Sequence, residues 1–199
     1  MKIGIYSAID VGDVKDKNID YIAADQGLFN LTKYHIQPIL AIGDFDSLES
    51  KSLLENIDCK TLPCIKDVTD THDAIDYAIE HGYDEIDLYG VTGKRLDHFF
   101  AVMCLLYKYR NIQITIYDNY NKITLLHAGK YNILNDYKYF SLFTQNASTI
   151  SITGAHYNLD NYNLKFDDPL CVSNQTDKKA CITTSDDIIL IQSNDKKED

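Results

Sequence analysis

Acidic side chains that lie two residues apart after an apolar segment can hold a divalent cation, and this chain carries such a pair. Asp44 and Asp46 follow the apolar run 39–42. An extended turn aims both carboxylates at one point, and Mg²⁺ commonly uses one or two carboxylates together with phosphate oxygens. The pattern predicts that Asp44 and Asp46 bind Mg²⁺. The alternative is that Asp46 or Ser47 caps an expected helix over 47–56.

A second acidic stretch, 66–73, precedes another expected helix. That helix is predicted over 71–81 by apolar residues at helical spacing. Asp70 or Thr71 can cap its first turn, while Asp73 can reach back to a free backbone amide. Asp70 can also bind a metal ion, and both roles remain open for it.

A glycine-rich turn, Gly90-Val91-Thr92-Gly93, joins an expected strand to an expected helix and can offer free backbone amides to an anion. Lys94 and Arg95 add positive charge beside it, and arginine can bind phosphate through two parallel hydrogen bonds. The turn is not a P-loop, which requires glycine at the position of Leu88 and Ser or Thr after the lysine. For His98, capping, packing and catalytic roles all remain open.

The segment after Arg95 has the apolar spacing of an amphipathic helix. Apolar residues recur there at intervals of three and four, so they are expected to form one buried stripe. The members of this expected stripe are Leu96, Phe99, Phe100, Met103 and either Leu106 or Tyr107.

Strand-like and helix-like segments alternate up to about residue 121, which implies a mainly parallel sheet with helices on its faces. The expected strands lie at 2–8, 20–24, 39–42, 59–62, 85–89 and 112–117. Ligands of such sheets bind beyond the carboxyl ends of the strands. Asp25, the acidic pair and the glycine-rich turn each follow one of these strands. The sequence therefore predicts one polar site at that edge.

Beyond about residue 121 the helical period is lost, and short segments rich in Ile, Thr, Tyr, Leu and Val take its place. Asn, Asp and Gly separate these segments, a pattern typical of an antiparallel sandwich or small barrel. Expected strands lie at 122–127, 139–143, 149–153, 170–172, 180–183 and 188–192. We therefore predict an α/β domain over residues 1–121 and an all-β sandwich over 122–199.

The net charge of −11 over 199 residues disfavours binding to nucleic acid or anionic membranes. A bound polyphosphate then needs local neutralisation, which a cation held by carboxylates supplies. No apolar run reaches the ~18 residues of a membrane span, and the start lacks a secretory signal, so we expect a cytosolic protein. The five cysteines include no CxxC pair and are expected to be free and buried.

These motifs together resemble those of the thiamine pyrophosphokinase family. The matching segments are Gly-Asp-Phe-Asp-Ser at 43–47, Lys-Asp-Val-Thr-Asp at 66–70, Gly-Lys-Arg-Leu-Asp-His at 93–98 and, in the second half, Gly-Ala-His-Tyr-Asn-Leu at 154–159 followed by Ser173-Asn174. Any one of them alone is weak evidence. Their occurrence in order over most of the chain makes the resemblance specific.

The resemblance implies an N-terminal nucleotide-binding and catalytic domain, a C-terminal sandwich that binds thiamine, and a homodimer with shared active sites. It implies the transfer of a pyrophosphoryl group from ATP to thiamine, with Mg²⁺ as cofactor. The acidic motif positions for Mg²⁺ and the triphosphate are Asp44, Asp46, Asp70 and Asp97, with Asp44, Asp46 and Asp70 as metal ligands. Further residues on the ATP side are Asp25, Ser47, Lys66, Thr69, Gly93, Lys94, Arg95 and His98.

On the thiamine side, Ser173 and Asn174 match the contacting segment of the family. Tyr157 lies where an aromatic ring can stack on a cationic heterocycle, an interaction of about 0.5–2 kcal/mol. The alternative for Tyr157 is a place in the sandwich core. The chain departs from the family pattern at Gln26 and Lys94, where glycine is usual, and a side chain at either position could crowd the phosphates.

Two other functions remain open on the sequence alone. An aspartyl-phosphate phosphatase also places two aspartates after an apolar strand, with the first as nucleophile. Against it, the pair follows the third expected strand, and Ser47 stands where that class usually has Thr. A non-catalytic sensor could bind a nucleotide or thiamine and release it unchanged. Identification of the reaction products distinguishes all three.

Overall fold

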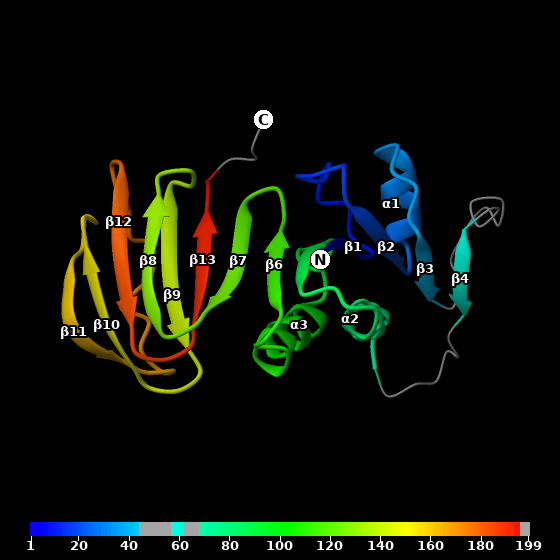
Figure 1. The fold of residues 1–199 in the computed structure, drawn as a ribbon. Helices are drawn as coiled ribbons and strands as arrows, with labels where there is room; N and C mark the ends of the chain where they lie inside the picture. The colour runs from blue at the N-terminus through cyan, green and yellow to red at the C-terminus, as the bar shows by residue number, and fades with distance from the viewer. Residues whose placement is uncertain (44–56, 62–67, 196–199) are drawn as a thin grey trace. The chain divides into compact units, whose positions relative to one another are not determined.

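The computed structural model describes residues 1–43, 57–61 and 68–195. The chain divides into two compact units, Met1–Asp118 and Asn119–Asp199 (Figure 1). The predicted acidic pair at Asp44 and Asp46 lies outside the described residues, and so do Ser47, Lys66 and the expected helix over 47–56.

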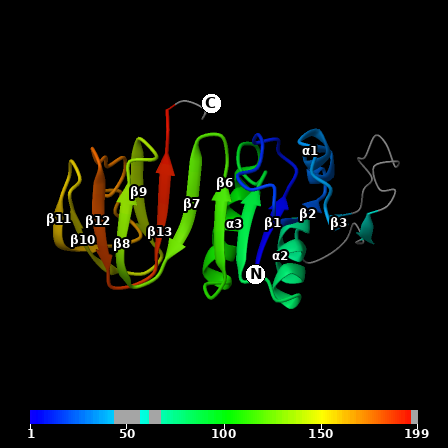
Figure 2. The same cartoon turned by 45° about the horizontal axis from the view of Figure 1, so that its top comes forward.

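The first unit is built on a parallel sheet, as the alternating pattern predicts. Its strands lie in the order β4-β3-β2-β1-β5-β6, and each neighbouring pair is parallel. Figure 2 shows β1 and β6 pointing the same way. The elements are β1 (Lys2–Tyr6), β2 (Asp20–Ala24), α1 (Gly27–Lys33), β3 (Leu40–Gly43), β4 (Asp58–Thr61), α2 (Asp70–Glu80), β5 (Glu85–Tyr89), α3 (Leu96–Lys108) and β6 (Gln113–Tyr117). Among these, α1 is not predicted from the sequence.

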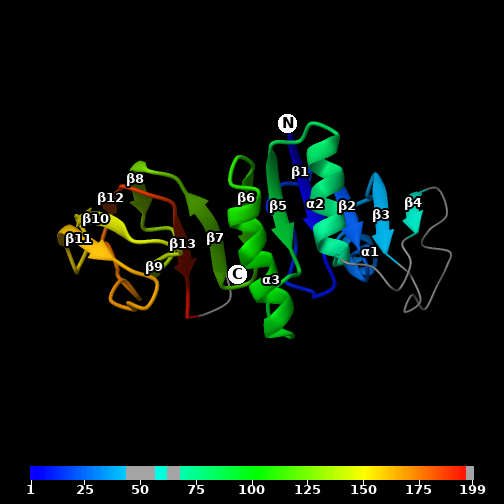
Figure 3. The ribbon, with the colours of Figure 1, turned by 90° about the horizontal axis from the view of Figure 1, so that it is seen from below.

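Helices cover both faces of this sheet. Side chains alternate along each strand, so both faces carry apolar side chains that must be buried. Tyr6 and Ala23 pack with Leu28 of α1 in one buried cluster. Ile5 and Ile22 are also fully buried and alternate with that set, on the side where α2 contacts β1, β2 and β3. In Figure 3, α2 and α3 lie in front of the strands and α1 lies behind them.

Helix α3 buries a different stripe from the predicted one. Its buried residues are Val102, Leu105 and Leu106. Leu96 and Phe100 are 78% and 63% exposed, so the prediction that they are buried is wrong. Leu96 and Phe100 lie in the N-terminal part of α3, before the segment that holds its buried residues.

The second unit is an antiparallel β structure made of two sheets. One has the order β7-β13-β9 and the other β11-β10-β12-β8. In Figure 2 the arrows of β7 and β13 point in opposite directions. The strands are β7 (Asn121–Leu126), β8 (Gly129–Leu134), β9 (Tyr139–Thr144), β10 (Ser148–Thr153), β11 (Leu159–Leu164), β12 (Lys179–Thr184) and β13 (Ile188–Ser193).

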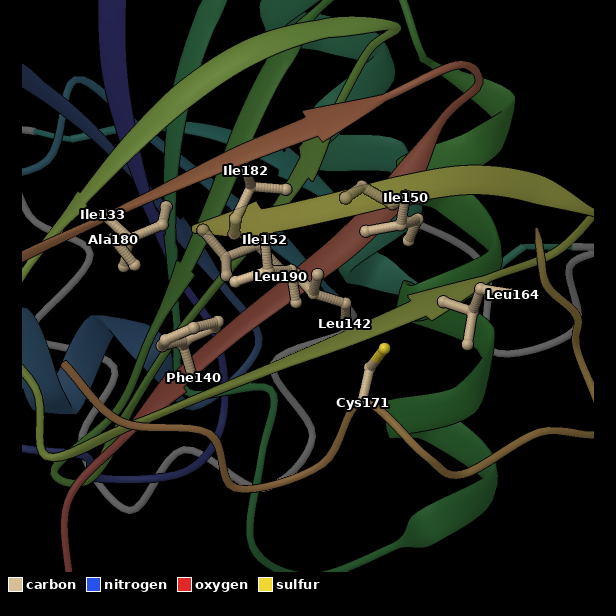
Figure 4. Packing of buried hydrophobic residues seen from close by; sticks show 11 residues of the cluster. Ile133, Phe140, Leu142, Ile150, Ile152, Leu164, Cys171, Ala180, Ile182 and Leu190 are labelled. Atoms are coloured by element: carbon tan, nitrogen blue, oxygen red, sulfur yellow. The ribbon is translucent and has the colours of Figure 1, made fainter. Parts of the chain in front are cut away.

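The core of the second unit lies between its two sheets, which confirms the predicted sandwich. Phe140, Leu142 and Leu190 come from one sheet and pack with Ile150 and Ile182 of the other in a single buried cluster (Figure 4). Each of these side chains is at most 3% exposed. Burial of large apolar side chains contributes about 1.5–3 kcal/mol apiece, so this layer holds the unit together.

For this unit the sequence-based prediction misses two strands and includes one strand that is not present in the described residues. Strands β8 and β11 are not predicted from the sequence, because each lies at an edge of its sheet and buries a single side chain, Ile133 or Leu164. The segment 170–172 is not a strand. Its Cys171 packs into the core, and the backbone carbonyl of Cys171 accepts one bond from the Leu142 amide at 2.8 Å, without a continuous ladder.

The cysteines among the described residues are free, as predicted, but they are not all buried. Cys59 and Cys104 are exposed, Cys181 is intermediate and Cys171 is buried. Burial raises the pKa of the Cys171 thiol to about 11. No helix in the described part of the chain is long and apolar enough to cross a membrane. The cytosolic location stays a prediction.

Candidate active site

A pocket of about 280 Å³ lies beyond the carboxyl ends of strands β1, β2 and β5. After β1 the chain adds β2, β3 and β4 on one side and then β5 and β6 on the other, so the strand order reverses between β1 and β5. Open parallel sheets bind ligands at such a reversal. The lining residues are Ser7, Ala8, Ile9, Asp25, Thr69, Thr71, Gly90, Val91, Lys94, Arg95, His98 and Val102.

One wall of the pocket continues from the end of β1. The amide of Ser7 donates to the Tyr89 carbonyl at 2.8 Å, and the amide of Ile9 donates to the Gly90 carbonyl at 3.1 Å. On the other side, the side-chain amide of the buried Asn30 donates to the Ser7 carbonyl at 3.3 Å. The wall is therefore fixed by bonds from both β5 and α1.

The glycine-rich turn after β5 requires glycine at two positions. Gly90 has a φ of +74°, and a Cβ there would lie 2.7 Å from the carbonyl oxygens of Ser7 and Ile9. Gly93 has a φ of +106° but more open surroundings, with the Ile9 side chain 3.9 Å away. Glycine adopts such backbone conformations with little strain. At Gly90 its lack of a side chain also permits close contact with the pocket wall.

The start of α2 contributes hydroxyl groups. Thr69 is the N-cap, and its side chain accepts a bond from the His72 amide at 3.2 Å. The prediction that Asp70 or Thr71 caps the helix is therefore wrong. The Thr71 hydroxyl lies 2.8 Å from the Ser7 hydroxyl, and both residues are buried at the pocket wall. Asp70 is the first residue of α2 and does not line the pocket, so its role as a metal ligand stays a prediction.

The start of α3 contributes positive charge. Arg95, His98 and Val102 recur at helical spacing and line the pocket together with Lys94. Arg95 donates to both carboxylate oxygens of Asp97, at 3.1 and 2.6 Å. This bidentate ion pair lowers the pKa of Asp97 to about 2. Asp97 is therefore ionised at neutral pH and orients the guanidinium of Arg95.

Asp25 lines the pocket from the end of β2. Its backbone has a φ of +54°, which is uncommon for a residue other than glycine. Its amide donates to the Ile42 carbonyl of β3 at 2.8 Å, which fixes the turn in place. Strained backbone of this kind recurs at functional sites, where the surrounding structure enforces it.

The pocket gathers most of the predicted ATP-side residues that the structure describes. Asp25, Thr69, Lys94, Arg95 and His98 all line it, although they come from separate segments. Sequence reasoning misses Ser7, Ala8, Ile9 and Thr71 as lining residues. The position of Ser7 could have indicated its role, since Ser7 follows β1 as Asp25 follows β2. Small neutral side chains, however, do not by their type indicate a binding site.

The two departures from the family pattern have different outcomes. Gln26 is exposed and does not line the pocket. Lys94 does line it, so this departure adds a cation to the site. Among the described lining residues, Lys94 and Arg95 are cationic and Asp25 is acidic, and Arg95 is also ion-paired with Asp97. In a chain with a net charge of −11, these two cations at the strand ends supply donors that can bind a polyphosphate.

The predicted thiamine segment lies in the second unit and has a different construction. Tyr157 is 71% exposed, so its alternative placement in the sandwich core is wrong. Ser173 is exposed, has a φ of +59°, and donates its backbone amide hydrogen to the Ser141 hydroxyl at 3.0 Å. Asn174 is 5% exposed, and its side-chain amide bonds to the backbone of Tyr157.

Known proteins support the resemblance seen in the motifs. The family model for the catalytic domain of thiamin pyrophosphokinase matches residues 13–117. The model for the vitamin B1 binding domain of thiamin pyrophosphokinase matches residues 128–189. A thiamine pyrophosphokinase of Bacillus subtilis is 34% identical over 180 residues, which cover 83% of this chain and 82% of that protein.

Solved structures agree in fold over nearly the whole chain. The crystal structure of thiamine pyrophosphokinase from Bacillus subtilis has a TM-score of 0.87 at 29% identity and covers 98% of this chain and 100% of its own. The corresponding structure from Geobacillus thermodenitrificans has a TM-score of 0.85 at 29% identity and covers 98% of each chain. Sequence motifs, family models and fold agree, and this chain belongs to the thiamine pyrophosphokinase family.

Proposed function

We propose that this protein transfers a pyrophosphoryl group from ATP to thiamine, giving thiamine diphosphate and AMP. The observation that carries the proposal is the pocket at the strand reversal, where Lys94, Arg95 and His98 gather in an otherwise acidic chain. Membership of the family supplies the reaction. The chemical step joins the hydroxyl oxygen of thiamine to the β-phosphorus of ATP. The bond from that phosphorus to the oxygen bridging to the α-phosphate breaks, and AMP leaves with this oxygen.

The pocket binds the triphosphate in this proposal. Transfer of phosphoryl-type groups depends mostly on positioning and on neutralising charge. Arg95 and Lys94 supply positive charge, and the amides of the turn at Gly93 lead into the N-terminus of α3, which favours anions. Thr69, Asp25 and His98 complete the ATP side. Ser47 and Lys66 are proposed for the same side from the motifs alone.

Mg²⁺ is the cofactor that suits this donor set. Asp25 and the hydroxyls of Thr69 and Thr71 give the pocket the hard oxygen donors that Mg²⁺ prefers. The described residues contain no cluster of three potential ligands. From the motifs alone we assign the metal to Asp44, Asp46 and Asp70. When bound, Mg²⁺ would neutralise charge that develops on the phosphate oxygens.

A general base is not required in this proposal, and Asp97 is poorly suited to be one. Its pKa of about 2, set by the Arg95 guanidinium, makes the carboxylate a weak proton acceptor. Asp97 instead orients Arg95 toward the phosphates. The proton of the thiamine hydroxyl then passes to solvent or to Asp70.

We also propose a homodimer with shared active sites. Leu96 and Phe100 of α3 are 78% and 63% exposed, and Phe166 and Leu170 of the second unit are 75% and 55% exposed. Pairing of two copies would cover such exposed apolar side chains, and phenylalanine is enriched at protein interfaces. Light scattering should give about twice 22.7 kDa at micromolar concentration. A monomer over that concentration range would contradict a shared site.

The reaction products test the function. The protein is incubated with ATP, thiamine and Mg²⁺, and the mixture is followed by phosphorus NMR. We expect AMP to form in step with thiamine diphosphate and EDTA to suppress both. ADP as the main product would indicate transfer of the γ-phosphoryl group. Free phosphate without thiamine would indicate a phosphatase, and unchanged ligands would indicate a sensor.

A further inference from the structure

The side-chain amide of Asn174 is bonded to both polar backbone groups of a single residue, Tyr157. Its Oδ1 accepts a hydrogen bond from the Tyr157 amide at 3.1 Å. Its Nδ2 donates to the Tyr157 carbonyl at 2.7 Å. The same Oδ1 also accepts from the Gln175 amide at 2.9 Å. The side chain therefore pairs with Tyr157 as a neighbouring strand would.

This pairing demands an amide side chain of this length. A carboxylate at position 174 would keep an acceptor for the Tyr157 amide, but it would turn a second oxygen toward the Tyr157 carbonyl. Ser or Ala would be too short to reach both groups. Asn174 is 5% exposed, so water does not readily replace a bond that is lost there.

Asn174 is itself anchored to the core of the sandwich. Its backbone forms an isolated bridge with Phe140, with a 2.9 Å bond in each direction. Phe140 is 2% exposed and belongs to the core cluster shown in Figure 4. A continuous set of contacts therefore runs from the core through Asn174 to the backbone of Tyr157.

The turn that carries Tyr157 is held on both sides by the same segment. The His156 amide donates to the Gln175 carbonyl at 2.8 Å, and the Thr176 hydroxyl donates to the Gly154 carbonyl at 2.8 Å. The ring of Tyr157, by contrast, is 71% exposed. A large aromatic side chain is thus presented to solvent on a rigid backbone.

We propose that Asn174 is a positioning residue for thiamine, and that it acts through the backbone of Tyr157 rather than by touching the substrate. The inference rests on the proposed function and on the expectation from the sequence that Tyr157 stacks on a ring of thiamine. Cation–π stacking depends on where the ring face lies. Fixing that face before binding reduces the ordering that binding itself must supply. The donor and the acceptor of the Asn174 side chain are both engaged within the protein.

The matched variants are Asn174→Asp, which removes the donor, and Asn174→Ala, which removes both bonds to Tyr157 and the bond from the Gln175 amide. Asn163→Asp and Asn163→Ala are the controls, because Asn163 is exposed on β11 of the same unit. We expect the Asn174 variants to raise the KM for thiamine by roughly 2- to 30-fold, the range of a lost cation–π contact. The kcat and the KM for ATP should stay within about twofold, because Asn174 is not among the residues that line the pocket.

Two further measurements keep the inference open to contradiction. Amide hydrogen exchange by NMR should be faster at Tyr157 in Asn174→Ala, and the remaining core amides will show whether the variant is folded. In a Tyr157→Leu background, Asn174→Asp should add little to the KM for thiamine, since its effect passes through the ring. An additive effect, or an unchanged KM in a folded variant, would overturn the inference while wild-type turnover upholds the function. A wild type that forms no thiamine diphosphate would overturn both.

Discussion

The two units place functional side chains in opposite ways. In the first unit, the pocket residues come from the ends of three strands and the starts of two helices, and the sheet topology alone brings them together. In the second unit, Tyr157 is placed by side-chain-to-backbone bonds from one neighbouring segment. Topology can therefore assemble a charged pocket from distant motifs, whereas local pairing can aim a single aromatic ring.

The difference extends to which parts are rigid. In the pocket, the fixed parts are backbone, such as the wall at Ser7 and the turn at Gly90, while Lys94 and Arg95 are exposed. Around Tyr157, the buried side chain of Asn174 holds the backbone in place, and the tyrosine ring is exposed. Substitutions should accordingly have different consequences in the two units.

The largest expected effect is on the acidic pair of the first unit. Asp44→Asn and Asp46→Asn should each lower turnover by at least about a hundredfold, because a metal ion contributes several kcal/mol to such reactions. Stability should change little, since neutralising acids beside one another relieves repulsion. Rates measured at saturating ATP and thiamine test this. Near-normal turnover in both variants would remove the metal assignment.

A structural contrast comes next, between two glycines of one turn. Gly90→Ala should destabilise the protein by about 2–3 kcal/mol, because the new Cβ meets two carbonyl oxygens at 2.7 Å in a strained backbone. Gly93→Ala should lower the free energy of unfolding by only about 1–2 kcal/mol, because the new Cβ strains the left-handed backbone but does not clash with neighbouring atoms. Urea unfolding of both variants measures the difference. Equal losses would mean that the wall at Ser7 and Ile9 moves freely.

A smaller effect should separate the two substrates. Lys94→Ala should raise the KM for ATP by about 3- to 10-fold, the equivalent of one exposed hydrogen bond of ~1 kcal/mol. The KM for thiamine should not change, in contrast to the Asn174 variants. Lys130→Ala is the matched control, because Lys130 is exposed on β8 of the second unit. A rise in both constants would mean that Lys94 does not serve the nucleotide alone.

The pocket could be predicted from the sequence to the extent that its residues carry charge. Asp25, Lys94 and Arg95 follow apolar strands, and a parallel sheet brings strand ends to one edge. Ser7 and Thr71 lie at the same edge but are small and neutral, so nothing in their type distinguishes them. The N-cap at Thr69 was ambiguous because Thr69, Asp70 and Thr71 are all competent capping residues.

The rest could not be predicted, because it depends on contacts between distant segments. The stripe of α3 follows helical spacing, yet Leu96 and Phe100 near its N-terminus remain exposed. Edge strands β8 and β11 bury too few side chains to show a period of two. The pairing of Asn174 with Tyr157 joins residues 17 positions apart, and no local pattern marks it.

The smallest expected effect concerns the ion pair that orients Arg95. The folded pKa of Asp97 is about 2, below the usual value of about 3.9, because Arg95 favours the ionised carboxylate. The stabilisation from the pair should therefore be fully present above about pH 4 and should decline as the pH falls from there toward 2. Both side chains are exposed, at 64% and 68%, so the contribution is small and weakened by salt.

Urea midpoints of the wild type and Asp97→Asn should accordingly differ by the same small margin at pH 7 and pH 5, and by less at pH 3. Asp136→Asn is the control, because it makes the same change of charge at an exposed turn of the second unit. No margin at pH 7 would mean that Asp97 does not hold Arg95 in solution. Because the pKa of Asp97 lies far below pH 5, any change of activity between pH 5 and 8 must come from another group. If the wild-type activity changes with pH in that range and this change is absent in Asp97→Asn, the result would therefore contradict a purely orienting role for Asp97.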